Sequence, residues 1–169
     1  MQIDQAGYRF NIGIILINDA HRVFLAKRIG HDGWQFPQGG VDSQESATDA
    51  LYREMKEEIG LDPDDVKILG STRHWLRYRL PKQYLRLDKK PLVIGQKQRW
   101  FLLKMQCNEQ KIRLDLTNSP EFDSWRWVDY WDSVSHVIYF KQQVYQQALK
   151  ELESFLTERV HQRGNHSLC

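Results

Sequence analysis

The 169-residue chain contains only two cysteines and no long apolar run, and these two features argue against several classes of protein. Cys107 and Cys169 lie far apart and match neither a Cys-x-x-Cys nor a Cys/His metal-binding spacing. A disulfide framework or a structural zinc site is therefore not expected, and a reducing compartment fits. The longest apolar run, Ile12 to Ile17, is far shorter than the roughly 20 residues that span a bilayer. We expect no membrane association.

The sequence also lacks internal repeats and a strong charge imbalance, and we expect no secretory signal. The first ten residues contain no basic segment followed by an apolar stretch, which favours a cytoplasmic location. The net charge of +2 neither requires nor excludes a nucleic acid partner. Hydrophobic content of 41% and charged content of 27% are typical of a globular domain. Neither a haem nor a nucleotide cofactor is expected.

The length suits one domain, which we predict over residues 1–160, followed by a polar, frayed tail over residues 161–169. Within that tail, His161 and His166 are candidate metal ligands, although solvated side chains fit a tail better. No coiled-coil heptads occur, so a monomer is expected.

Strand signals surround one strongly marked helix. β-rich runs at 10–17 and 22–27 flank a turn-forming segment, which predicts a hairpin. Further strands are predicted at 66–80, 98–106 and 124–128, with a short extended piece at 34–36. A helix from Gln44 to Ile59 is predicted by Asp42 and Glu45 at its start and Gly60 at its end.

A second, amphipathic helix is predicted from about Phe140 to Val160, because apolar residues recur there at helical spacing. Mixed strands with two helices toward opposite ends of the chain are typical of an α+β, sandwich-like layered domain.

The first predicted helix contains three glutamates close together, within Arg53–Glu58 (REMKEE). At about 100° per residue, Glu54, Glu57 and Glu58 lie together on the face beside the apolar stripe. That stripe consists of Ala47, Leu51, Met55 and Ile59. Only Arg53 is well placed to pair with the glutamates, as the i,i+4 partner of Glu57.

Unneutralised carboxylates raise one another's pKa, and clustered hard oxygen ligands suit Mg²⁺ or Mn²⁺. Glutamate-rich surface helices are also common, so the helix alone allows either a metal site or a salt-bridged surface.

A longer motif favours the metal site. The pattern G-x5-E-x7-R-E-U-x-E-E-x-G-U, with U a bulky apolar residue, is complete from Gly39 to Leu61. On these nine specified positions over 23 residues, the chain resembles the Nudix hydrolases. The resemblance implies a Nudix fold, which is a mixed β-sheet α/β/α sandwich with the loop–helix–loop at its catalytic centre. It also implies Mg²⁺ or Mn²⁺, two or more ions with substrate bound, bridging a pyrophosphate.

The resemblance implies roles for individual residues. Glu54, Glu57 and Glu58 would ligate metal, with the carbonyl of Gly39 as a further ligand. Glu54 is our first candidate for the general base, and a ligand-only role is its alternative. Glu45, Arg53 and Gly60 would be structural. Glu121, in a loop outside the motif, is either an accessory ligand or alternative base, or simply a loop acid.

Further blocks resemble the bacterial RNA pyrophosphohydrolases, a group within the Nudix superfamily, over about residues 3 to 155. They include WQFPQGG at 34–40, WLRY at 75–78, IGQKQ at 94–98 and PEFD at 120–123. The resemblance implies hydrolysis of 5′-triphosphate or diphosphate RNA ends to a monophosphate, which promotes messenger RNA decay.

Two alternatives stay open. Dinucleoside polyphosphate hydrolases share much of the pattern, so diadenosine polyphosphates are a second candidate substrate. A non-catalytic RNA- or nucleotide-binding module is a third reading, against which the intact motif argues.

The segment from Thr72 to Pro91 has seven Lys or Arg residues against one acid, with Trp75, Tyr78 and Tyr84 interleaved. Basic and aromatic residues together are typical of single-stranded nucleic acid sites, although a strand with solvated cations gives the same pattern. The resemblance implies that seven residues contact substrate: Arg9, Arg28, Tyr78, Gln96, Ile138, Phe140 and Lys141. A plain surface role for Arg28 and a core role for Phe140 are the alternatives.

Overall fold

The apolar run near the N-terminus forms the central strand of a mixed sheet. In the computed structural model, which describes residues 1–166 and the side chains of residues 1–156, β1 pairs in parallel with β7 and antiparallel with β2. All other strand pairings are antiparallel. The strands are β1 Tyr8–Ile17, β2 Val23–Arg28, β3 Trp34–Gln35, β4 Gln38–Gly40, β5 Val66–Ser71, β6 Leu76–Arg79, β7 Gly95–Met105 and β8 Phe122–Val128. The helices are α1 Ala47–Ile59 and α2 Gln142–His166. None of the described helices has the length and apolar character needed to cross a membrane.

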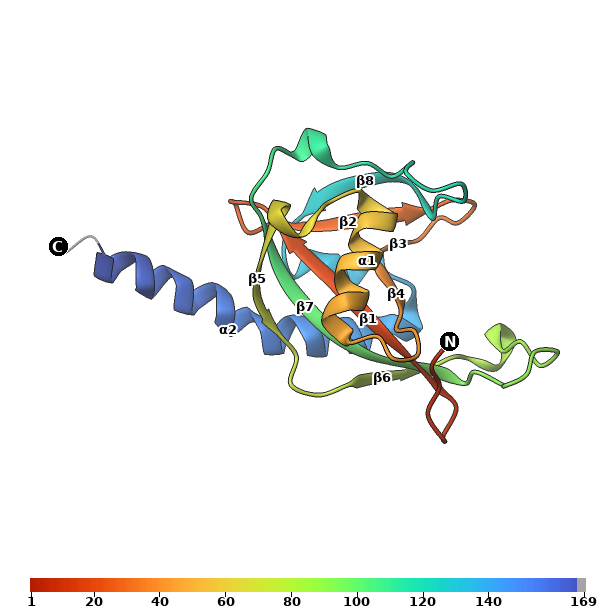
Figure 1. The fold of residues 1–169 in the computed structure, drawn as a ribbon. Helices are drawn as coiled ribbons and strands as arrows, with labels where there is room; N and C mark the ends of the chain where they lie inside the picture. The colour runs from red at the N-terminus through yellow and green to blue at the C-terminus, as the bar shows by residue number, and fades with distance from the viewer. Residues whose placement is uncertain (167–169) are drawn as a thin grey trace.

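Alternate residues of β1 enter two different cores, because successive side chains of a strand point to opposite faces. Ile12 and Ile14 pack in the core under α1, whereas Ile15 packs with Trp100 and Tyr145 in the core under α2. Figure 1 shows α1 in front of the sheet and α2 behind it. The predicted α+β layered sandwich is confirmed.

Helix α1 begins later than predicted. Gln44 has a φ of 69°, in the left-handed region, so the helix cannot include it. The N-cap is Ser46, whose hydroxyl accepts from the Asp49 backbone N–H at 3.0 Å. Gly60 ends the helix at a φ of 76°, as predicted. The apolar stripe is confirmed, with Leu51, Met55 and Ile59 buried and Ala47 partly buried.

The prediction of one strand over 66–80 is wrong, because the chain leaves the sheet between β5 and β6. Thr72 still forms a backbone hydrogen bond to Trp100, and its hydroxyl also accepts from the Trp100 N–H at 3.0 Å. The next N–H, of Arg73, donates instead to Glu151 on α2 at 2.7 Å. Trp75 then packs edge-on against Phe10, so this aromatic belongs to the core.

Helix α2 also differs from its predicted bounds. A 3₁₀ turn over Tyr139–Lys141 precedes it, so the α-helix begins at Gln142. It extends to His166, which makes residues 161–166 of the predicted frayed tail helical. Residues 167–169 and the side chains of His161 and His166 lie outside what the structure describes. In Figure 1 the end of α2 projects away from the sheet.

Candidate active site

Strand β4 carries the first glycine of the motif and separates two functional groups. It pairs with β1, placing Gly39 opposite Ile12 and Gly40 opposite Asn11. A Cβ at Gly39 would overlap the carboxylate of Glu54, and one at Gly40 would overlap the guanidinium of Arg9. The predicted catalytic carboxylate and a predicted substrate residue therefore reach the same short strand from its two faces.

We predict that Gly39→Ala lowers kcat by about 10²-fold, the effect of displacing a catalytic group by roughly 1 Å. The added methyl group must push Glu54 away from β4, because the two cannot share that space. Steady-state hydrolysis measures the loss, with Gly33→Ala as the matched control because a Cβ there meets nothing within 4 Å. Equal activity of the two variants would contradict this account of Glu54.

Arg53 connects the helix to the loop before it. Its guanidinium donates to both carboxylate oxygens of Glu45, to Glu54 and to the Gly40 carbonyl, each at 2.8 Å. The hydrogen bonds from Arg53 hold the pKa of Glu45 at about 2 and raise the pKa of Arg53 itself. The expected i,i+4 pair with Glu57 is present but longer, at 3.6 Å.

Glu58 is the carboxylate least compensated by the protein. Its Oε2 is enclosed and, among the described residues, has no hydrogen-bond partner. Burial raises the pKa of Glu58 well above its ordinary value, and the charges of Glu54, Glu121 and Glu57 raise it further. Burial also raises the pKa of Glu54, against the lowering effect of Arg53. These two groups gain most from a nearby cation.

Glu121 faces the motif glutamates from another part of the chain. Its carbonyl accepts from the Ile29 N–H at 3.0 Å, and its carboxylate lies 3.6 Å from Arg28 Nε. Its charge contributes to the raised pKa values of Glu54 and Glu58. We call Glu54, Glu57, Glu58 and Glu121 the glutamate cluster.

The side chains of the glutamate cluster are chemically suited to a hard divalent ion, but their present arrangement would not hold one. All four members offer oxygen ligands, and the enclosed Glu58 Oε2 needs a partner. Within residues 1–156, however, no group of three or more His, Cys, Asp or Glu side chains has an arrangement that encloses a metal ion. Glu54 is instead directed toward Arg53. Metal binding would therefore require these side chains to turn.

Three predicted substrate residues form one row across the sheet. Gln96 on β7 lies opposite Arg9 on β1 and opposite Tyr78 on β6. Residues paired across neighbouring strands point to the same face, here the α2 face. Arg9 Nε and Gln96 Oε1 are enclosed without hydrogen-bond partners among the described residues. Burial raises the pKa of Tyr78 above its ordinary value. We call these three residues the Tyr78 row.

Two more predicted substrate residues surround Tyr78. The Phe140 and Tyr78 ring centroids are 5.9 Å apart, and Lys141 Nζ lies 5.8 Å from the Tyr78 centroid. Burial, and then the charge of Arg28, lower the pKa of Lys141 to about 8. Ile138 begins the same turn and is 37% exposed. The structure thus brings the predicted substrate residues to one region beside the glutamate cluster.

Gln38 is a site residue that the sequence prediction missed. Hydrogen bonding by its backbone lowers the pKa of Glu58, and hydrogen bonding by its side chain lowers the pKa of Tyr78, in each case against the larger, raising effect of burial. Gln98 donates to Gln38 Oε1 at 2.9 Å and to Asn11 Oδ1 at 2.8 Å. Gln38 therefore connects the glutamate cluster with the Tyr78 row. Two signals in the sequence could have identified Gln38. One is its position beside Gly39, and the other is the polar residue Asn11 at the start of the buried part of β1.

Comparisons with known proteins identify the family of the chain. The NUDIX domain family model matches residues 7–148. The RNA pyrophosphohydrolase of Legionella pneumophila strain Corby is 66% identical over 156 residues, covering 92% of this chain and 89% of that protein. The RNA pyrophosphohydrolase of Pseudomonas putida strain F1 is 57% identical over 157 residues, covering 93% and 99%.

Solved structures show the same fold at low identity. The dihydroneopterin triphosphate pyrophosphohydrolase of E. coli superposes with a TM-score of 0.66 at 22% identity, covering 83% of this chain and 95% of that one. An Ap4A hydrolase binary complex from C. elegans gives a TM-score of 0.65 at 20% identity, covering 89% and 98%.

Proposed function

The chain belongs to the Nudix family, and from that premise we propose that it is an RNA pyrophosphohydrolase. It would convert 5′-triphosphate or diphosphate RNA ends to a 5′-monophosphate, releasing pyrophosphate or phosphate and promoting messenger RNA decay. The observation that carries the proposal is the identity of 57–66% over at least 89% of the length of relatives that bear this name. The intact glutamates argue against a non-catalytic binding module. A cytoplasmic monomer is part of the same proposal.

Nudix hydrolases generally use divalent metal ions. We propose Mg²⁺ or Mn²⁺, two or more with substrate, held by the glutamate cluster and the Gly39 carbonyl. When bound, such ions neutralise phosphate oxygens and make a water molecule more acidic.

The protein's own residues then position the reactants. We assign Glu54 as the base that accepts the proton of the attacking water. Its burial raises its pKa toward the working pH, which suits a general base. Arg53 orients its carboxylate at 2.8 Å. Water adds to phosphorus, the phosphoanhydride P–O bond breaks, and the leaving phosphate takes the bond's electron pair.

The remaining site residues bind substrate in this proposal. Arg9, Arg28 and Lys141 would contact phosphates, because guanidinium and ammonium groups donate to phosphate oxygens. Phe140 would stack on a base, with Tyr78, Gln96 and Ile138 completing the surface that contacts substrate. Glu45 and Gly60 keep the helix and its loops in place.

The test compares a triphosphorylated short RNA with diadenosine tetra- and pentaphosphate, at equal concentration in Mg²⁺. The proposal expects the RNA to be the better substrate by kcat/KM. A hundredfold preference for the dinucleotides would replace it with a diadenosine polyphosphate hydrolase. Failure to hydrolyse any phosphoanhydride would favour a binding module.

The lowered pKa of Lys141 gives a pH prediction. Because its pKa is about 8, Lys141 loses its charge, and with it a phosphate contact, as pH rises through 8. We expect kcat/KM for triphosphorylated RNA to fall above pH 8, by up to about tenfold per pH unit. Lys141→Arg keeps its charge at every such pH and should flatten this decline. Profiles from pH 7 to 9.5 measure the difference, and parallel declines of both proteins would contradict it.

A further inference from the structure

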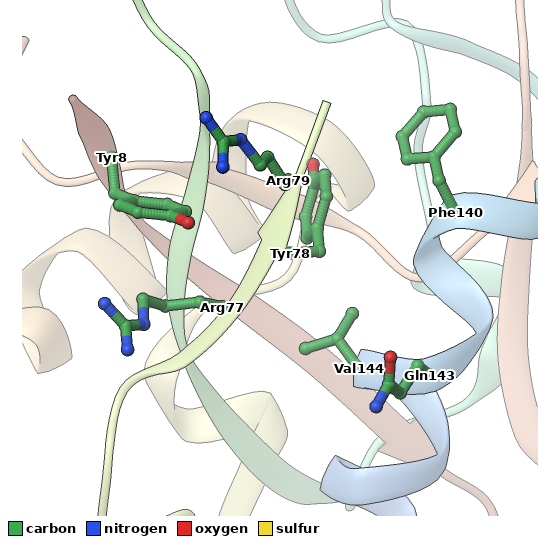
Figure 2. Close-up of a pocket in the computed structure, with 7 residues that line it drawn as sticks. All are labelled: Tyr8, Arg77, Tyr78, Arg79, Phe140, Gln143 and Val144. Carbon is green, nitrogen blue, oxygen red and sulfur yellow. The ribbon is translucent and has the colours of Figure 1, made fainter. Parts of the chain in front are cut away.

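A cleft of about 370 Å³ lies at the edge of the sheet, next to the Tyr78 row but outside the predicted reaction centre. Its lining includes Tyr8, Arg77, Tyr78, Arg79, Phe140 and Gln143 (Figure 2). We propose that this cleft binds the single-stranded RNA chain downstream of the 5′ end that reacts. The proposal rests on the proposed function and adds a second binding site to it.

The position of the cleft follows from strand register. Gly95 lies opposite both Tyr8 on β1 and Arg79 on β6, which places these two side chains on one face. Gly95 also makes room for the Tyr8 ring, since a Cβ there would lie 2.9 Å from Tyr8 Cε1. Among the described strands, β6 pairs only with β7, so its outer edge is free to line a groove.

The opposite wall comes from the start of α2. In Figure 2, Phe140 and Gln143 lie on the α2 side of β6, and Tyr8 and Arg77 lie on the other side of that strand. Tyr78 and Phe140 are shared between the cleft and the predicted substrate region. An RNA strand leaving the glutamate cluster past Tyr78 therefore enters the cleft next.

The charge of the cleft suits a phosphate backbone. Arg77 and Arg79 are both exposed, and no carboxylate within the described residues forms an ion pair with either. Arg77 lies 5.3 Å from the Tyr8 ring centroid, which holds its guanidinium at the mouth. The adjoining arm, residues 80–94, extends from the sheet in Figure 1 and carries four basic residues against one acid.

The aromatic residues suit unpaired bases. Tyr84, at the base of the arm and 42% exposed, has its ring 5.1 Å from that of Phe140. Tyr78, Phe140 and Tyr84 thus form a continuous line of rings from the substrate region outward. Arginine forks bind phosphates and aromatic faces stack on bases, and together they recognise single-stranded RNA without sequence preference. A dinucleoside polyphosphate has no chain to place there.

The experiment uses 5′-triphosphorylated RNAs of one sequence, two and eight nucleotides long. In wild type, kcat/KM should be higher for the octanucleotide. In Arg77→Ala/Arg79→Ala, the ratio of kcat/KM for the octanucleotide to kcat/KM for the dinucleotide should fall about tenfold or more at 0.1 M salt. The reason is that two phosphate contacts to a single strand give a slope of about −1.4 when the logarithm of affinity is plotted against the logarithm of salt concentration. The salt slope for the octanucleotide should become correspondingly shallower.

Arg22→Ala/Arg113→Ala is the matched control. It removes the same charge from two exposed arginines that pair with Asp129 and Asp115, away from the cleft. Binding of a 5′-hydroxyl octanucleotide, followed by fluorescence anisotropy, should weaken in the cleft variant and not in the control. Equal losses on both substrate lengths, an unchanged ratio, or equal effects of the two variants would overturn the inference while the proposed function stands. If wild type hydrolyses neither RNA, the proposed function itself fails.

Discussion

Glu58→Gln is expected to remove most of the hydrolytic activity and at the same time to stabilise the metal-free protein. Losing one preorganised electrostatic group costs about 10²- to 10³-fold in kcat, and Glu58 would hold a metal ion. The same carboxylate destabilises the metal-free fold, because its Oε2 is enclosed and has no hydrogen-bond partner among the described residues. Gln leaves a polar amide at this position but removes the buried charge, whose uncompensated desolvation costs about 1–3 kcal/mol of the free energy of unfolding.

The gain in stability should depend on pH with a definite sign. The pKa of Glu58 in the folded protein is raised well above the value of 4.5 expected when unfolded. At pH below 4.5 the group is protonated in both states and costs nothing. As pH rises from 4.5 through the raised folded pKa, ionisation destabilises the fold. The difference between Glu58→Gln and wild type should therefore be small at pH 4 and largest at alkaline pH.

Glu57→Gln is the matched control on the same helix face. Its side chain is 49% exposed, so replacing it should lower activity without stabilising the protein. Urea denaturation in EDTA at several pH values and steady-state hydrolysis in Mg²⁺ give the two readouts. If Glu58→Gln retained wild-type turnover, Glu58 would not be a member of the catalytic site.

The positions that the sequence placed correctly in the fold are those joined by local spacing. The positions from Gly39 to Leu61 follow one another through a loop and a single helix, so their pattern alone places Glu54 and Glu58 beside the buried stripe. The helix periodicity depends only on geometry within four residues, and it was therefore predicted correctly.

The features that the sequence did not predict depend on register between distant strands. Gln98 reaches Asn11, 87 positions away, only because β1 and β7 run in parallel with one particular pairing. The break at Thr72 likewise needs Glu151 on α2 to capture the next backbone N–H. Local β propensity is the same on both sides of that break, so the single long strand was a reasonable but wrong prediction.

Arg53→Ala is expected to be the most destabilising substitution in the site. Arg53 forms four hydrogen bonds of 2.8 Å, and its carboxylate partners Glu45 and Glu54 have side chains only 16% and 12% exposed. Removing one member of a buried pair leaves the other charge uncompensated, at up to 3–5 kcal/mol when burial is complete. For these partly buried groups we expect a loss of about 2–4 kcal/mol.

Acid should narrow the gap between Arg53→Ala and wild type. Arg53 lowers the folded pKa of Glu45 from 4.5 to about 2, so their pairing stabilises the fold fully above pH 4.5. That contribution is lost as pH falls from 4.5 toward 2, because Glu45 then becomes protonated. The difference in unfolding free energy should thus shrink between pH 6 and pH 3. Urea denaturation across this range measures it.

Two variants separate the pairing from a general effect of losing a cation on this helix. Lys56→Ala removes a half-exposed lysine that pairs with Asp62 at 3.1 Å, and such surface pairs contribute about 0–1 kcal/mol. Glu45→Gln/Arg53→Ala also removes one uncompensated carboxylate, so it should be more stable than Arg53→Ala alone. If Arg53→Ala matched Lys56→Ala, or if the double variant were the weaker protein, Arg53 would not brace the loop. Activity should fall in both variants that lack Arg53 and be retained in Lys56→Ala, since only the hydrogen bond from Arg53 orients Glu54.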